Sequence, residues 1–155
     1  IHILSDPLAL TMLARACERG VTQPEVGRLV GELYRLLGHV AVAATFPRAV
    51  VEVPTRMIEH TPAGVWRGPV VTRDTRAVVV ALARAGLLPS QITYDFLNQV
   101  LDPRGVRQDH LSLGREVDAA GRVTGAALGA VKIGGGVDGA VLLIGSNQPL
   151  LDQVA

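Results

Sequence analysis

The sequence predicts an α/β domain built on a mostly parallel sheet. Two segments, residues 77–82 and 139–144, are apolar at consecutive positions, which is typical of strands buried on both faces of a sheet. A helical pattern over residues 87–100 follows the first of them, as in a β–α–β crossover unit. With 155 residues, 48% hydrophobic and 3% aromatic, the chain suits one aliphatic core. We therefore expect a single domain over residues 1–155, with helices on both faces of the sheet.

Two helices are expected at the N-terminus. Ser5 or Asp6 can cap the first, with Pro7 at its first helical position. The apolar spacing of this helix places Cys17 in the core, and no neighbouring group would lower its pKa enough to make it a reactive thiol. Residues 22–25 have the form of a capping box for a long second helix. The predicted apolar face of that helix consists of Val26, Leu29, Val30, Leu33, Leu37, Val40 and Ala44.

A short strand and then a loop or edge hairpin are expected before the first buried strand. Residues 50–53 are rich in valine, and Pro54 closes the run. Residues 55–75 are rich in Pro, Gly, Thr and Arg, as in turns. Trp66 beside Arg67 could stack on a nucleic-acid base, but we interpret the pair as part of a packed surface hairpin.

The segment after the predicted helix 87–100 contains a third strand and a glycine-rich stretch. The strand is expected from Val106 to Leu113, where it ends at Gly114. Residues 117–138 predict either a flexible excursion or a two-stranded arm around Val123 and residues 126–133. An apolar arm of this kind can pair with a second subunit, so we expect a homodimer.

Three strand ends predict an anion-binding crevice. Arg84, Ala85 and Gly86 directly follow the first buried strand, and ligands of open α/β sheets gather outside the carboxyl ends of strands. A guanidinium there can bind phosphate or carboxylate through two parallel hydrogen bonds. Arg115 follows the third predicted strand. After the fourth, Gly145 and Ser146 precede a predicted helix whose first N–H groups could also face an anion.

Charge and composition exclude several other classes of protein. Fifteen basic and fourteen acidic residues give a net charge of +1, so we expect neither a nucleic acid nor a membrane as partner. Contact between RNA and the Arg- and Gly-rich loops is a weaker alternative. A lone Cys17 excludes an intrachain disulfide or cysteine metal cluster and favours a cytoplasmic location. The four histidines lack metal-ligand spacing, although His110 could approach the crevice. Asp109 and Glu116 could bind magnesium or a ribose hydroxyl, or be ordinary exposed carboxylates.

Four segments of the chain together resemble the uracil phosphoribosyltransferase family. They occur in the family's order, and the resemblance extends over residues 4–146. The most specific is the Arg-Ala-Gly-Leu turn after a valine-rich strand. The segments are residues 5–8, 32–37, 79–87 and 113–115.

The resemblance implies the type I phosphoribosyltransferase fold and a defined reaction. That reaction transfers the phosphoribosyl group of 5-phosphoribosyl 1-diphosphate to uracil and gives UMP and pyrophosphate. Arg84 would match the arginine of the pyrophosphate-binding turn, with Ala85 and Gly86 letting the backbone approach the diphosphate, and Arg115 would match a second donor-binding arginine. Magnesium would share the stabilisation of the departing pyrophosphate.

The sequence also departs from that family at the donor and base sites. Residues 142–144 run straight into Gly145 and Ser146, where the family has an acidic, Gly- and Thr-rich loop, and the family's Gly- and Asp-rich C-terminal segment is absent. Either the sequence omits parts of a normal enzyme, which we favour, or the protein is a catalytically silent regulator or assembly subunit with the same fold. We expect the domain to be incomplete at its C-terminus.

Overall fold

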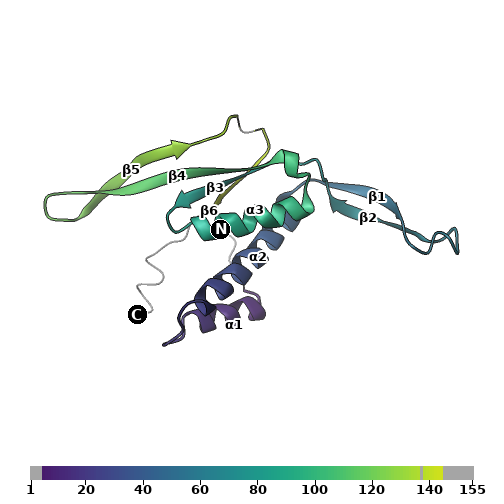
Figure 1. Ribbon diagram of the computed structural model, residues 1–155, viewed down its shortest axis with the longest axis horizontal. Helices are drawn as coiled ribbons and strands as arrows, with labels where there is room; N and C mark the ends of the chain where they lie inside the picture. The colour runs from purple at the N-terminus through teal and green to yellow at the C-terminus, as the bar shows by residue number, and fades with distance from the viewer. Residues whose placement is uncertain (1–4, 137, 145–155) are drawn as a thin grey trace.

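The computed structural model describes residues 5–136 and 138–144 as a mixed α/β structure (Figure 1). In the described residues, no helix is long and apolar enough to cross a membrane. The helices are α1 (Pro7–Ala16), α2 (Glu25–Thr45), α3 (Leu87–Val100) and the short 3₁₀ helix η1 (Pro103–Gly105). The strands are β1 (Arg48–Pro54), β2 (Val65–Val71), β3 (Ala77–Ala83), β4 (Val106–Val117), β5 (Val123–Lys132) and β6 (Ala140–Ile144).

The main sheet has four strands in the order β5-β4-β3-β6. Strand β3 lies parallel to both β4 and β6, and Ala81 pairs with Ile144 while Ala83 pairs with Ser112. The carboxyl ends of β3 and β6 therefore lie at one edge of the sheet, level with Ser112 of β4, and β4 itself continues beyond that edge to Val117. Helix α3 connects β3 to β4 and packs on both of them.

Helices α2 and α3 pack on one face of this sheet. Val79 of β3 shares a buried cluster with Val42 of α2 and with Phe96 and Leu97 of α3. Side chains alternate between faces along a strand, so the neighbours of Val79 face the other way. On that opposite face the glycine loop 134–136 crosses β4, and no helix packs there within the described residues. The expectation of helices on both faces is thus met on one face only.

The N-terminal helical pair is present, but three details of its prediction were wrong. Asp6 caps α1 by accepting a hydrogen bond from the amide of Ala9 at 3.0 Å. Cys17 is exposed rather than in the core, because it is the C-cap residue of α1 and the predicted apolar face of this helix is itself exposed at Leu10 and Leu13.

The expected capping box of α2 does not form. The N-cap residue is Pro24, and it is the side chain of Gln23 that accepts a hydrogen bond, at 3.1 Å, from the amide of Gly27. Glu25 pairs with Arg15 at 2.6 Å instead of turning back to the cap. The predicted apolar face is buried at Leu29 but continues toward the C-terminus through Gly38 and Val42, leaving Leu37, Val40 and Ala44 exposed.

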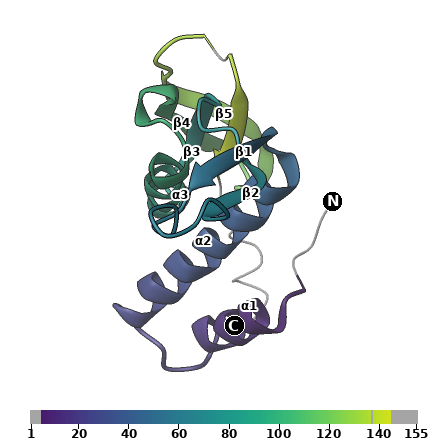
Figure 2. The same ribbon diagram turned by 90° about the vertical axis from the view of Figure 1, so that its right-hand side faces the viewer.

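Two hairpins project from opposite ends of the molecule (Figures 1 and 2). The antiparallel pair β1–β2 forms a sheet of its own, which resolves the choice between loop and hairpin in favour of the hairpin. Trp66 lies on it, 46% exposed, with its ring over Gly68. The second hairpin consists of β5 and the part of β4 beyond Ser112. A two-stranded arm is therefore present, but its first strand is the continuation of β4 and does not lie within residues 117–138 as predicted.

Candidate functional site: the carboxyl edge of the parallel strands

Arg84 lies where the sequence placed it, in the turn that connects β3 to α3. The turn comprises Arg84, Ala85 and Gly86 and follows the last residue of β3 directly. The side chain of Arg84 is exposed, and it forms no ion pair with any other residue that the structure describes. Its guanidinium is therefore available to a dissolved anion.

The backbone of this turn is held tightly on both sides. The amide of Gly86 donates to the carbonyl of Leu82 at 2.8 Å, and the amide of Leu87 donates to the carbonyl of Arg84 at 3.2 Å. Gly86 is buried, and a Cβ atom there would lie 2.7 Å from the Leu82 oxygen and would overlap the carbonyl oxygen of Ile144. Glycine is needed here for close approach between backbones, since its φ of −78° is open to any residue.

Backbone donors accompany the arginine. Within the described part of the chain, the amides of Ala85 and Leu88 donate to no other residue. Both belong to the turn or to the first residues of α3, where helix amides have no intrahelical acceptor. The turn thus offers an exposed guanidinium and two unused N–H groups within five residues, Arg84 to Leu88.

Arg115 does not lie at a strand end, contrary to the sequence expectation. Strand β4 continues to Val117 because β5 pairs with it, and Arg115 faces Ala126 within the arm. It is three residues past Ser112, the partner of the last residue of β3, which places its backbone about 10 Å further along the strand. Gly145 and Ser146 lie outside the described residues, and β6 reaches Ile144 at the edge where Arg84 lies.

Asp109 is a structural carboxylate and not a candidate for magnesium or ribose. It lies in the middle of β4 opposite Val80, its side chain is 4% exposed, and it pairs with Arg107 at 2.9 Å. It also accepts the amide of Gly134 at 3.1 Å. The Arg-x-Asp spacing within a strand could have revealed this pair, because alternate residues share a face.

The remaining acidic and histidine candidates lie away from the turn or are enclosed. Glu116 lies on the arm, opposite Gly125. His110 pairs with Ala81, and its Nδ1 atom is buried with no hydrogen-bond partner among the residues that the structure describes. Within the described residues, no three His, Cys, Asp or Glu side chains gather in a way that could hold a metal ion.

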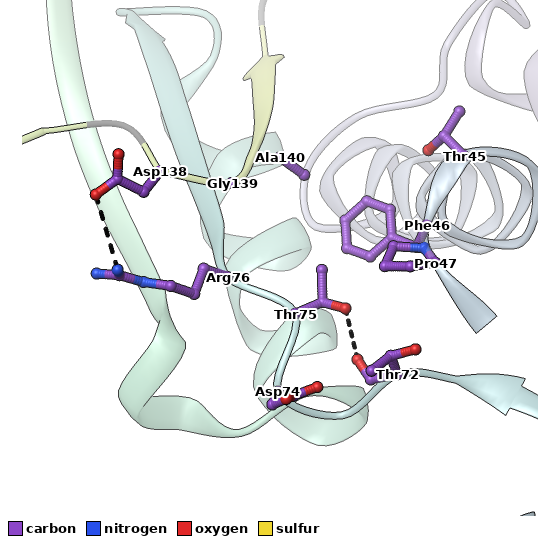
Figure 3. A pocket seen from close by; sticks show the side chains of 10 residues that line it. All are labelled: Thr45, Phe46, Pro47, Thr72, Asp74, Thr75, Arg76, Asp138, Gly139 and Ala140. Atoms are coloured by element: carbon purple, nitrogen blue, oxygen red, sulfur yellow. Dashed lines mark hydrogen bonds and ion pairs between the residues drawn. The ribbon is translucent and has the colours of Figure 1, made fainter. Parts of the chain in front are cut away.

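A cavity of about 660 Å³ lies at the opposite edge of the sheet (Figure 3). It opens between the end of α2 and the first residues of β3 and β6, where Phe46, Thr75 and Arg76 line it. Arg76 forms a long ion pair of 3.9 Å with Asp138, and Thr75 donates to the carbonyl of Thr72 at 2.6 Å. The sequence offered no signal for this hollow, whose lining combines both charges with a phenyl ring. Ligands of parallel sheets bind at the carboxyl edge, so the Arg84 turn is the stronger candidate.

Comparison with known proteins supports the fold and no more. No family model and no curated protein matches the chain. It is similar in structure to the AQ2163 protein from Aquifex aeolicus, with a TM-score of 0.63 and 17% sequence identity over 93% of this chain. The match spans 61% of that protein's chain, so the present chain corresponds to about three-fifths of it.

Proposed function

We propose that the chain binds the diphosphate of 5-phosphoribosyl 1-diphosphate at the Arg84 turn and transfers the phosphoribosyl group to uracil. The observation that carries the proposal is an exposed arginine that forms no ion pair with another described residue and lies in a turn whose backbone is fastened between β3 and Ile144, at the carboxyl edge of parallel strands. The choice of donor and of uracil comes from the resemblance of residues 79–87 and 113–115 to uracil phosphoribosyltransferases.

The proposed reaction requires stabilisation of the negative charge that develops on the departing pyrophosphate. When the bond from ribose C1 to the diphosphate oxygen breaks, charge grows on pyrophosphate while the new bond to the uracil nitrogen forms and that nitrogen loses its proton. A guanidinium and fixed backbone N–H groups stabilise such charge without reorganising. Arg84 and the amides of Ala85 and Leu88 would supply these contacts.

We include magnesium in the proposal only as an ion that the substrate would bring with its phosphates. The resemblance implies Mg²⁺, but the described side chains offer no ligand set for it. Mg²⁺ is commonly bound by substrate phosphates with one or two protein carboxylates. We assign no catalytic step to it in this chain.

A second copy of the chain is the proposed partner of the β4–β5 arm. The arm carries exposed apolar side chains on both strands, and solvent-exposed apolar strands favour pairing. The exposed apolar residues of this arm and its exit are Val117, Val123, Leu128, Val131 and Ile133.

Titration calorimetry with pyrophosphate tests the anion site directly. We expect Arg84→Gln to weaken pyrophosphate binding about tenfold or more, because it removes charge-assisted hydrogen bonds of about 1.5–3 kcal/mol. Arg73→Gln is the matched control: it removes an exposed arginine before β3, at the other edge of the sheet, and should leave affinity unchanged.

Formation of UMP from 5-phosphoribosyl 1-diphosphate and uracil tests the reaction separately. Turnover that falls with Arg84→Gln but not with Arg73→Gln would support the enzyme. Binding of the donor without UMP formation would instead favour the catalytically silent regulator, and no binding of pyrophosphate or donor would reject both.

A further inference from the structure

We infer that Gln108 and Ser90 are positioning residues that fix the Arg84 turn against strand β4. The two side chains meet across the interface between α3 and the sheet, with the Gln108 Nε2 atom donating to the Ser90 Oγ atom at 3.0 Å. The consequence for ligand binding rests on the proposed function, whereas the positioning itself does not.

Ser90 connects this bond to the turn. Its side chain is fully buried, at 0% exposure, and its hydroxyl donates to the carbonyl of Leu87 at 2.9 Å. Its own amide donates to the carbonyl of Gly86 at 2.9 Å. Leu87 in turn donates to the carbonyl of Arg84 at 3.2 Å, so an unbroken set of hydrogen bonds leads from β4 to the arginine.

The other side-chain hydrogen bonds of α3 stay within the helix. The buried hydroxyl of Thr93 donates to the carbonyl of Pro89 at 2.9 Å, and the Asn98 amide donates to the carbonyl of Tyr94 at 2.8 Å. Apart from the Gln108–Ser90 bond, α3 and the described residues of the sheet meet through the apolar cluster around Val79, Phe96 and Leu97. Apolar contact is non-directional, whereas a hydrogen bond requires a defined distance and angle.

This bond therefore sets where the first turn of α3 lies along β4. The same strand carries Arg115 into the arm, so the bond links the two segments that hold the predicted donor-binding arginines. A catalytic arrangement is sensitive to displacements of about 1 Å. Loosening the Gln108–Ser90 bond should displace Arg84 relative to β4 without unfolding the domain.

Four variants test the inference: Gln108→Met, Ser90→Ala, the double variant, and Thr93→Val as control. The control removes a buried hydroxyl from the same helix but no bond to β4. Amide hydrogen exchange is measured over residues 84–90 on the folded proteins, and pyrophosphate affinity is measured by calorimetry. Circular dichroism and thermal unfolding establish that each variant is folded at the temperature used.

We expect Gln108→Met and Ser90→Ala each to accelerate exchange of the Gly86, Leu87 and Ser90 amides about tenfold relative to Thr93→Val. Pyrophosphate binding should weaken about three- to tenfold in the same two variants. The double variant should lose no more pyrophosphate affinity than the more affected single variant, because the effects of two substitutions that remove the same bond are not additive.

Equal acceleration in Thr93→Val, or additive losses in the double variant, would overturn the inference. If the native protein binds no pyrophosphate, the proposed function fails, but the exchange comparison still decides whether Gln108 and Ser90 hold the turn. Unchanged exchange at residues 84–90 in both single variants would reject the positioning role whatever the protein binds.

Discussion

The backbones of Gly86 and Ile144 are in direct contact, although one follows β3 and the other ends β6. A Cβ atom on residue 86 would overlap the Ile144 carbonyl oxygen and would also lie 2.7 Å from that of Leu82. The arginine turn is thus fastened to the neighbouring strand at the point where the proposed ligand would bind.

Gly86→Ala should therefore displace the turn or β6. The atoms that the added methyl group would meet belong to the backbone and cannot swing aside as the end of a side chain could. The substitution should therefore lower the free energy of unfolding by about 1–3 kcal/mol, as overpacking does. Urea denaturation measures it, and pyrophosphate affinity should fall in parallel. As a control, Gly136→Ala has nothing near its added methyl among the described residues and should change stability by less than about 1 kcal/mol. Equal behaviour of the two variants would refute the close packing of Gly86.

Arg107→Met should be strongly destabilising. It leaves the carboxylate of Asp109, 4% exposed, without its ion-pair partner. Removing one partner of a buried pair costs about 3–5 kcal/mol, and we expect the lower end because the Arg107 side chain is 29% exposed. The urea midpoint measures this loss.

The exposed ion pair between Arg76 and Asp138 provides a comparison for the buried pair between Arg107 and Asp109. Arg76→Met removes the partner of Asp138, which is 85% exposed, and should cost less than about 1 kcal/mol. The double variant Arg107→Met with Asp109→Leu should recover most of the loss, because no buried charge remains. A metal-binding role for Asp109 would instead show as Mg²⁺-dependent stability of the native protein.

Asp102 should titrate well below the usual range for an aspartate. The side-chain hydrogen bonds from Arg104, followed by the backbone hydrogen bond from the same residue, lower the pKa of Asp102 from 3.8 to about 2. The folded pKa lies below the unfolded one, so the stabilisation by this carboxylate is complete above pH about 4 and is lost as pH falls toward about 2.

Arg104→Gln should raise the pKa of Asp102 toward 3.8. A carboxyl-carbon NMR titration measures the midpoint, which should stay somewhat below 3.8 because the backbone amide of residue 104 still donates. Asp118 is an internal control, since its lowered pKa depends on Arg122 and should not change. An unaltered Asp102 midpoint would contradict the assigned cause.

The arm should mediate self-association. Val117 and Val123 pair across β4 and β5 and are 58% and 61% exposed. If the arm pairs with a second copy, Val123→Lys should shift the native species from dimer to monomer in light scattering coupled to size exclusion. Thr124→Lys, one residue along β5 and on its other face, is the matched control. A monomeric native protein would reject the dimer.

The sequence predicted correctly those helices and strands whose bounds depend on residues close together in the chain. The bounds of α3 agree with the predicted residues 87–100, because proline near its start and Asp102–Pro103 beyond its end act within one turn. The consecutive apolar residues of β3 predicted burial on both faces, and Val78 to Ala81 are all buried. The position of Arg84 followed from the end of β3.

Features that depend on a distant partner were missed. Strand β4 extends to Val117 because β5 returns alongside it. No local sequence pattern before Val117 indicates that β5 will pair with this strand. Asp109 is buried because the loop at Gly134 crosses it, and the hollow beside Phe46 arises only where three elements meet.

The sequence by itself determined the α/β class, the crossover around α3 and the exposed arginine at a strand end, since these follow from periodicity, capping and turn residues close together in the chain. Only the tertiary structure decided that Gly86 meets Ile144, that Gln108 holds Ser90 and that Arg115 lies out on an arm. These relationships join residues far apart in sequence, and pairing and packing between such residues depend on the whole fold rather than on any local pattern.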